Sequence, residues 1–363
     1  MERLRVLTAA LSSRATGKPP PVNKSPIEGQ PPGLLCARNF RYEDSPHPSA
    51  YLRVQGLTYE SYDIHWHPKI TSIMTATMLS RFHAQFTPLP ASSNDKEGIR
   101  EKTYFMDWPI LTDKYFTFVS STEFVMSRAM YDNNLCKSPV DMKLSLGYIG
   151  NSSLAVVNDF YACSDVQKPS APLWTNTVQL VAVDKTTRKP AKLPDWYQSK
   201  YKGRGCRSKG LIIRAFERPA VTYAHPSVVQ YSECGNYKHA TWVAYVGWAI
   251  DALHAALLLQ NSTVLTSYSS YSHAATPGDS PNVRARAALK GISKDIVARG
   301  LHKLHLIFLN ECLQGEYVET HLWQEDGEEK ELVYFSVVKD GKDMCQMKMW
   351  FFNDASSQEG KHL

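Results

Sequence analysis

The feature that most constrains this chain is one order of elements that occurs twice along it. A helix-like segment, residues 67–86, carries apolar side chains at helical spacing. Four strand-like runs follow it, at 115–125, 142–149, 153–162 and 174–183. A second helix-like segment around Trp242 precedes runs at 301–310, 316–324, 331–339 and 343–352. A helix with a wide apolar face needs a sheet to cover it, so the pattern predicts an α+β fold built from two similar units.

Composition divides the chain into parts. We predict an N-terminal extension at 1–48 with a proline-rich linker, a first domain at 49–203, a second at 211–353 and a polar tail at 354–363. The basic, glycine-bearing stretch Lys200–Gly210 is the expected connection between the domains. An irregular, serine-rich insertion is expected at about 261–290.

The overall composition excludes several classes of protein. Hydrophobic residues make up 43% of the chain, which is enough for a full core. No run approaches the roughly 18 apolar residues of a membrane helix, so no integral membrane segment is expected. The net charge of +6 comes partly from residues 1–47, with seven basic against four acidic residues, and forms no basic stripe with interleaved aromatics. Nucleic-acid binding is therefore not expected.

The cysteines and the two ends of the chain bear on its location. The seven cysteines contain no C-x-x-C pair, which favours reduced thiols in an intracellular compartment over disulfides or a zinc site. The start, MERLRVLTAALSSRATGKPPP, resembles a mitochondrial transit peptide, although a disordered tail fits the composition equally well. We expect a mitochondrial matrix protein. Cytoplasmic and peroxisomal locations are the alternatives, the latter from the terminal Lys361-His362-Leu363.

Four passages carry a resemblance to a known family. In SECGNYKHATWVAYVGWAIDAL, His239 is followed by Tyr245 and by Gly247-Trp248. LHLIFLNECLQGE contains Glu311-Cys312, and YDIHWHPKIT places Asp63 four residues before His67, with His65 between them. VAVDKTTRKPAKLPDW, residues 181–196, is similar to a closing strand of the same family. Together these passages resemble the hot-dog thioesterases, and the double hot-dog acyl-ACP thioesterases in particular.

The resemblance implies two tandem hot-dog domains, each an antiparallel sheet wrapped round a long central helix, paired as a pseudo-dimer. It implies hydrolysis of fatty acyl thioesters on CoA or acyl carrier protein, without a cofactor or metal. Asp63, His67, His239 and Glu311 are the implied catalytic residues. A carboxylate could act as general base or attack directly, and a helix N-terminus could hold the carbonyl oxygen. The implied substrate-binding residues are His65, Asn236, Tyr237 and Cys312.

The sequence departs from the family pattern in its second half. Gly235 and Tyr237 stand where the family has an aspartate and an asparagine, and Thr241-Trp242 replaces a pair of asparagines. In the first half, Gly150-Asn151-Ser152 is the expected counterpart of Glu311 and offers no carboxylate. Each half thus keeps part of the expected set.

Plainer interpretations of the same residues stay open. Asp63 fits an N-cap of a helix that begins near Pro68, and His239 fits a polar helix end. His65 and His67 invite a metal, but they lack a third ligand. Cys312 fits a small buried residue. At the level of function, the alternatives are a dehydratase or hydratase of acyl thioesters and a non-catalytic acyl-binding or assembly protein. A monomeric pseudo-dimer and a homodimer are both compatible with the sequence.

Overall fold

The computed structural model describes residues 38–89, 103–163, 171–261, 280–290, 292, 295–327 and 330–353. The described residues from Arg38 on form one compact unit. Residues 1–37 of the predicted extension at 1–48, which include the expected transit peptide, lie outside the described residues, as does the tail from 354 on.

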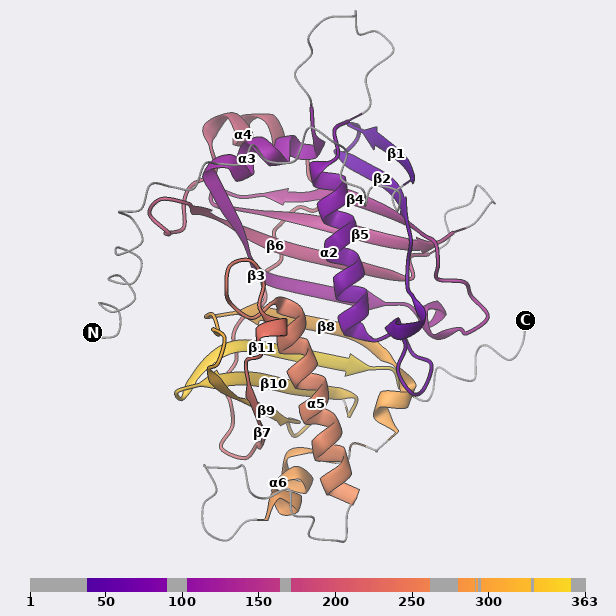
Figure 1. The fold of residues 1–363 in the computed structure, drawn as a ribbon, viewed down its shortest axis with the longest axis vertical. Helices are drawn as coiled ribbons and strands as arrows, with labels where there is room; N and C mark the ends of the chain where they lie inside the picture. Colours follow the sequence, from indigo (N-terminus) through magenta and orange to yellow (C-terminus); the bar gives the residue numbers. More distant parts are fainter. Residues whose placement is uncertain are drawn as a thin grey trace, which may run out of the picture. The chain divides into compact units, whose positions relative to one another are not determined.

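The described strands form a single sheet of 11 strands in the order β1-β2-β4-β5-β6-β3-β8-β11-β10-β9-β7 (Figure 1). All neighbouring strands pair antiparallel. The strands of the first half are β1 (Arg38–Glu43), β2 (Ser49–Val54), β3 (Tyr115–Met126), β4 (Val140–Ile149), β5 (Ser153–Ala162) and β6 (Trp174–Asp184). Those of the second half are β7 (Tyr223–Val228), β8 (Leu301–Phe308), β9 (Tyr317–Trp323), β10 (Leu332–Lys339) and β11 (Lys342–Phe351).

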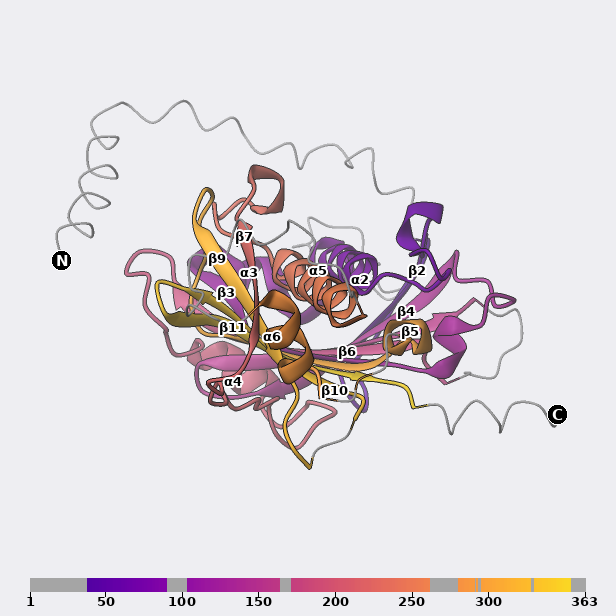
Figure 2. The same cartoon turned by 90° about the horizontal axis from the view of Figure 1, so that it is seen from below.

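Two long helices lie on one face of this sheet, which curls round them (Figure 2). They are α2 (Ile70–Phe86) and α5 (Trp242–Asn261). The halves meet where β3 pairs with β8, from Ser121 opposite Ile307 to Val125 opposite Lys303. The arrangement confirms the predicted α+β class, with each half an antiparallel sheet round one long helix.

The first half shows how a helix is fixed to its sheet. Trp174 of β6 is fully buried, stacks on Phe160 of β5 at 4.2 Å between ring centroids, and donates its Nε1–H to Thr77 Oγ1 of α2 at 3.0 Å. Replacing a buried tryptophan of this kind by alanine costs about 3–5 kcal/mol. Ile73 and Met74, both fully buried, complete the contact of α2 with the core.

The second central helix, α5, differs from the expectation that no segment of the chain is long and apolar enough to cross a membrane. Its window Trp242–Gln260 meets both conditions. Asp251 and His254 interrupt the apolar run without making the helix polar on average. Yet 56% of that window is buried, and Val246, Ala249 and Leu253 are inaccessible to solvent. In this fold α5 serves as the core helix of the second half.

Short elements appear where the sequence predicts irregular chain. β1 lies in the stretch assigned to the linker and pairs with β2 at the edge of the sheet. Residues 281–288 of the serine-rich insertion form α6 (Pro281–Ala288), which packs against α5, whereas 262–279 lie outside the described residues. Two further helices are α3 (Trp108–Lys114) and α4 (Asp195–Tyr201).

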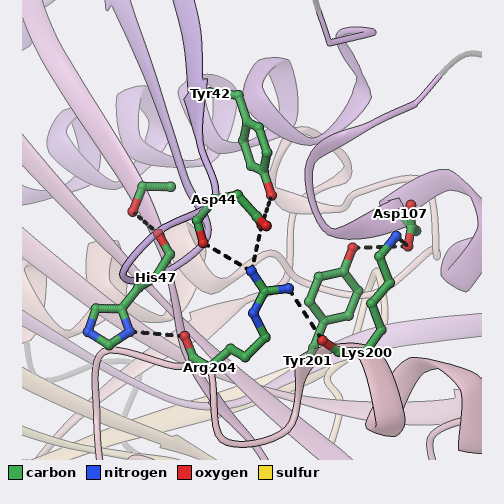
Figure 3. Close-up of polar contacts among 8 residues, drawn as sticks. Tyr42, Asp44, His47, Asp107, Lys200, Tyr201 and Arg204 are labelled. Atoms are coloured by element: carbon green, nitrogen blue, oxygen red, sulfur yellow. Dashed lines mark hydrogen bonds and ion pairs between the residues drawn. The ribbon is translucent and has the colours of Figure 1, made fainter.

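The connection between the halves is fastened to the first half by a polar network (Figure 3). Asp107 Oδ2 accepts hydrogen bonds from Lys200 Nζ at 2.6 Å and from the Tyr201 hydroxyl at 2.9 Å. Arg204 forms an ion pair of 2.7 Å with Asp44, just after β1. These bonds hold the predicted interdomain connection against the sheet and α3.

Candidate active site at the first central helix

Two turns of the same shape precede the two central helices. The Asp63 N–H donates to the His67 carbonyl at 2.9 Å, and the Gly235 N–H donates to the His239 carbonyl at 3.0 Å. Trp66 and Lys238 occupy the same place in the two turns, with φ of 61° and 65°. Each histidine stands three residues before the first residue of its helix, so both halves present a histidine at a helix N-terminus.

The carboxylate of Asp63 holds the first turn together. Its Oδ1 accepts the backbone N–H groups of His65 at 2.8 Å and His67 at 2.9 Å. The capping interpretation of Asp63 is therefore wrong, because the N-cap of α2 is Lys69. Oδ2 of Asp63 makes no hydrogen bond within the described part of the chain, so this oxygen is available to a ligand or a water.

The imidazole of His67 is uncharged at neutral pH. Burial lowers its pKa, and so does His65, while the negative charge of Asp63 and the backbone of Val297 oppose the shift. Its ring packs edge-on against Tyr131 at 4.9 Å between centroids. Nδ1 is buried and has no hydrogen-bond partner among the described residues. A neutral imidazole carries one lone pair, so His67 can accept a proton from a bound water.

A cavity of about 330 Å³ opens at this turn and is shared by both halves. From the first half come Asp63 and His67, together with the first turn of α2. From the second half come residues of α5 and of the segment around β8. The remaining lining residues are Pro68, Lys69, Ile70, Thr71, Ile73, Tyr131, Gly247, Ile250, Asp251, His254, Val297, Gly300, Leu301 and Phe351. The walls are largely apolar, and the first N–H groups of α2 have no partner within the helix.

Sequence reasoning missed the contribution of α5 to this cavity. Gly247, Ile250, Asp251 and His254 follow one another at helical spacing and share one face of the helix, beside its buried apolar stripe. A polar pair three residues apart in an otherwise apolar helix is the signal that could have revealed this face. The sequence could not show which cavity this face lines, because the first-half residues of that cavity lie far away along the chain.

The second-half turn differs in its chemistry. His239 Nδ1 lies 3.0 Å from its neighbour's carbonyl, that of Ala240, and Nε2 lies 4.0 Å from Glu311. The Glu311 side chain is 59% exposed, so solvent screens this pair. Tyr237 stacks over His239 at 6.0 Å between centroids, and Gly235 supplies no carboxylate. The structure thus brings His239, Glu311 and Tyr237 together, but it leaves Asn236 exposed.

Cys312 has a structural role. It is fully buried, burial raises the pKa of its thiol, and its backbone N–H donates to the Tyr245 hydroxyl at 3.1 Å. Tyr245 thereby holds the loop that carries Glu311. That loop follows β8, which corresponds to β3 in the first half, so its counterpart is the turn Arg128–Tyr131. The expected counterpart Gly150-Asn151-Ser152 is wrong, because it connects β4 with β5.

The comparisons with known proteins concern the fold. No protein-family model matches the sequence, and no curated protein matches it. Among solved structures, the 12:0-ACP thioesterase from Umbellularia californica aligns with a TM-score of 0.51 and 11% identity, over 83% of this chain and 97% of that one. An acyl-ACP thioesterase from Bacteroides thetaiotaomicron gives 0.50 and 11%, over 84% and 98%. A Lactobacillus plantarum protein provisionally named an oleoyl thioesterase gives 0.53 and 14%, over 85% and 99%.

The protein has the hot-dog fold of thioesterases. The first hot-dog half supplies a turn with a fixed carboxylate and a neutral histidine, and the central helix of the second half closes the cavity over them. Within the described residues no group of three or more His, Cys, Asp and Glu is placed to hold a metal ion. His65 is exposed beside His67 and adds no third ligand. The groups available for chemistry at this cavity include the carboxylates of Asp63 and Asp251, the imidazoles of His67 and His254 and the N–H groups at the start of α2.

Proposed function

We propose that this protein hydrolyses fatty acyl thioesters, carried on CoA or on acyl carrier protein, at the cavity of the first half. The observation that carries the proposal is the meeting of the Asp63–His67 turn, the N-terminus of α2 and the polar face of α5 around one largely apolar space. Ligand sites in proteins commonly combine apolar walls with a few convergent polar groups. The hot-dog fold, shared with acyl-ACP thioesterases, supports the same reaction class.

The proposed reaction uses the residues of this turn. A water molecule bound between Asp63 Oδ2 and the His67 ring loses a proton to one of them and attacks the thioester carbonyl carbon. The carbonyl oxygen, which gains negative charge, lies at the N–H groups of the first turn of α2, where the helix dipole also favours an anion. The C–S bond then breaks, and the thiol leaves with a proton returned from the base.

Steady-state hydrolysis of an acyl-CoA and acyl-ACP panel tests this function, with free thiol as the readout. We expect Asp63→Asn to lower kcat/KM by about 10²–10⁴-fold, the usual contribution of a general base. Glu311→Gln serves as the matched control in the second half and is expected to retain most activity. Full activity in the Asp63→Asn, Glu311→Gln double variant would exclude both halves as the site.

The same assay separates the alternatives. A dehydratase or hydratase would change enoyl absorbance without releasing thiol, and a non-catalytic acyl-binding protein would bind acyl-CoA without turnover.

A location in the mitochondrial matrix is proposed on the N-terminal sequence, and expression of the full chain with a C-terminal fluorescent tag tests it.

A further inference from the structure

The inner face of α2 carries a polar stripe, whereas the corresponding positions of α5 are apolar. Thr77, Arg81 and Gln85 follow one another at four-residue spacing and therefore share one face of the helix. The bond between Trp174 and Thr77 shows that this face lies against the sheet. Gln85 is only 3% exposed, so the stripe continues into the interior.

Arg81 is the unusual member of this stripe. It stands eleven residues after the first residue of α2, and the residue at the same distance along α5 is the fully buried Leu253. Within the described residues Arg81 forms no ion pair or hydrogen bond, and its Nη1 atom is buried. Burial lowers the pKa of Arg81 to about 10, so the guanidinium keeps its charge at neutral pH. A guanidinium nitrogen that is buried without a hydrogen-bond acceptor is costly.

Two other buried donors without partners lie nearby. The guanidinium carbon of Arg81 is 5.8 Å from the centre of the Trp242 ring, and the indole Nε1 of Trp242 has no acceptor among the described residues. Gln85, one helical turn from Arg81, has an unpartnered Nε2. Trp242 is 8% exposed and is the first residue of α5, a helix of 20 residues whose N-terminus also favours negative charge. Arg81 and Trp242 offer only donors, and the unpartnered atom of Gln85 is also a donor, so the missing partner is an acceptor.

The surroundings indicate which acceptor fits. The Trp242 ring contacts Phe124 of β3 at 5.7 Å between centroids, and the next face of α2 exposes Met78 and Phe82 by 40% and 56%. Arg81 itself is partly exposed, which connects the buried donors with this apolar surface. We propose that Arg81, Gln85 and Trp242 bind the carboxylate of a fatty acid, with its alkyl chain along the apolar surface of α2. This site belongs to the side of His239 and does not depend on hydrolysis at Asp63.

Calorimetric titration of the full-length protein with decanoate and with decanol tests the proposal. We expect decanoate to bind at least about tenfold more tightly than decanol, because charge-assisted hydrogen bonds distinguish the anion. Arg81→Leu is expected to lower the decanoate affinity by about 10- to 100-fold, to the level of decanol. Trp242→Phe, which keeps the ring but removes the N–H, is expected to weaken decanoate binding several-fold. Inorganic phosphate is the third probe, and no comparable binding is expected, since it lacks a chain.

The stability of ligand-free Arg81→Leu provides an independent readout. The same position in α5 holds a leucine, so the variant should fold and unfold at an equal or higher temperature than the parent. Asp63→Asn is the matched control and should leave decanoate affinity unchanged even if hydrolysis is lost. Equal binding of decanoate and decanol, or undiminished decanoate binding by Arg81→Leu, would overturn the proposal. Failure of the thioesterase assay would leave this result unaffected.

Discussion

A glycine on α5 offers the sharpest test of the candidate active site. Gly247 lines the cavity, and a Cβ atom added to it would meet no other atom within 4 Å. Alanine there should stabilise the helix by about 1 kcal/mol, the propensity difference between the two residues. For a chain of this size that corresponds to a rise in Tm of about 2 °C.

Leucine at the same position should keep the protein stable but lower its hydrolytic activity. The helix again gains propensity, but the side chain enters the cavity and displaces about three to four methylene groups of an acyl chain. At about 0.8 kcal/mol per methylene, that displacement removes about 3 kcal/mol of binding and lowers kcat/KM by about 100-fold. The assay is hydrolysis of acyl-CoA alongside thermal unfolding of the same preparations.

The chain contains its own control for this substitution. Thr75 stands five residues after the start of α2, as Gly247 does in α5, but it is exposed on the outer surface. Thr75→Leu should therefore leave activity unchanged. If Gly247→Leu is stable and fully active, or if Thr75→Leu loses the same activity, the cavity is not the site of hydrolysis.

Four further outcomes are expected. Asp63→Asn keeps an oxygen that accepts the N–H groups of His65 and His67, so it should lower the free energy of unfolding by less than about 1 kcal/mol. Asp63→Ala removes this acceptor and should lower it by about 1–3 kcal/mol, as measured by denaturant unfolding. Gly235→Asp, whose Cβ would meet only Thr241 Cγ2 at 3.4 Å, should build the missing carboxylate and add about 1 kcal/mol of stability that disappears as pH falls below about 4. Because burial lowers the pKa of His67, the acid limb of kcat/KM should lie below about pH 6.5, and His67→Asn should remove it. Burial lowers the pKa of His321 to about 4, so the unfolded chain takes up a proton at this histidine at a higher pH than the folded chain does. The free energy of unfolding should therefore fall by up to about 3 kcal/mol between about pH 6.5 and pH 4. Unfolding measured across this pH range should show a flatter slope for His321→Gln.

The long elements could be predicted from sequence because their patterns are local. The eight predicted strands match β3–β6 and β8–β11 within about two residues. The helix α2 lies within its predicted segment, and α5 begins at Trp242, where the second helix was expected. Edge strands escaped prediction for a physical reason. β7 contains Pro226, which an edge strand tolerates because one of its sides has no neighbour to pair with. β1, at the other edge, has little apolar alternation to reveal it.

The site could be predicted only where its residues share one turn. Asp63, His65 and His67 interact through bonds that span four residues, so their spacing already implies the geometry. The cavity needs Asp251 and His254, which reach the turn because β3 pairs with β8 and brings the two helices together. That pairing joins residues about 180 positions apart, and no local pattern encodes it.

The two halves carry the same turn before the same helix, so their differences indicate a division of roles. In the first half the turn keeps its carboxylate, and α5 facing it supplies an acid and a histidine. In the second half the carboxylate is replaced by Gly235, while α2 facing it supplies Arg81 where α5 has a leucine. A carboxylate beside neutral histidine suits proton transfer, whereas an unpaired guanidinium beside an indole N–H suits retention of an anion. Substitutions at Asp63 and at Arg81 should therefore affect different ligands, the first the thioester and the second the free acid.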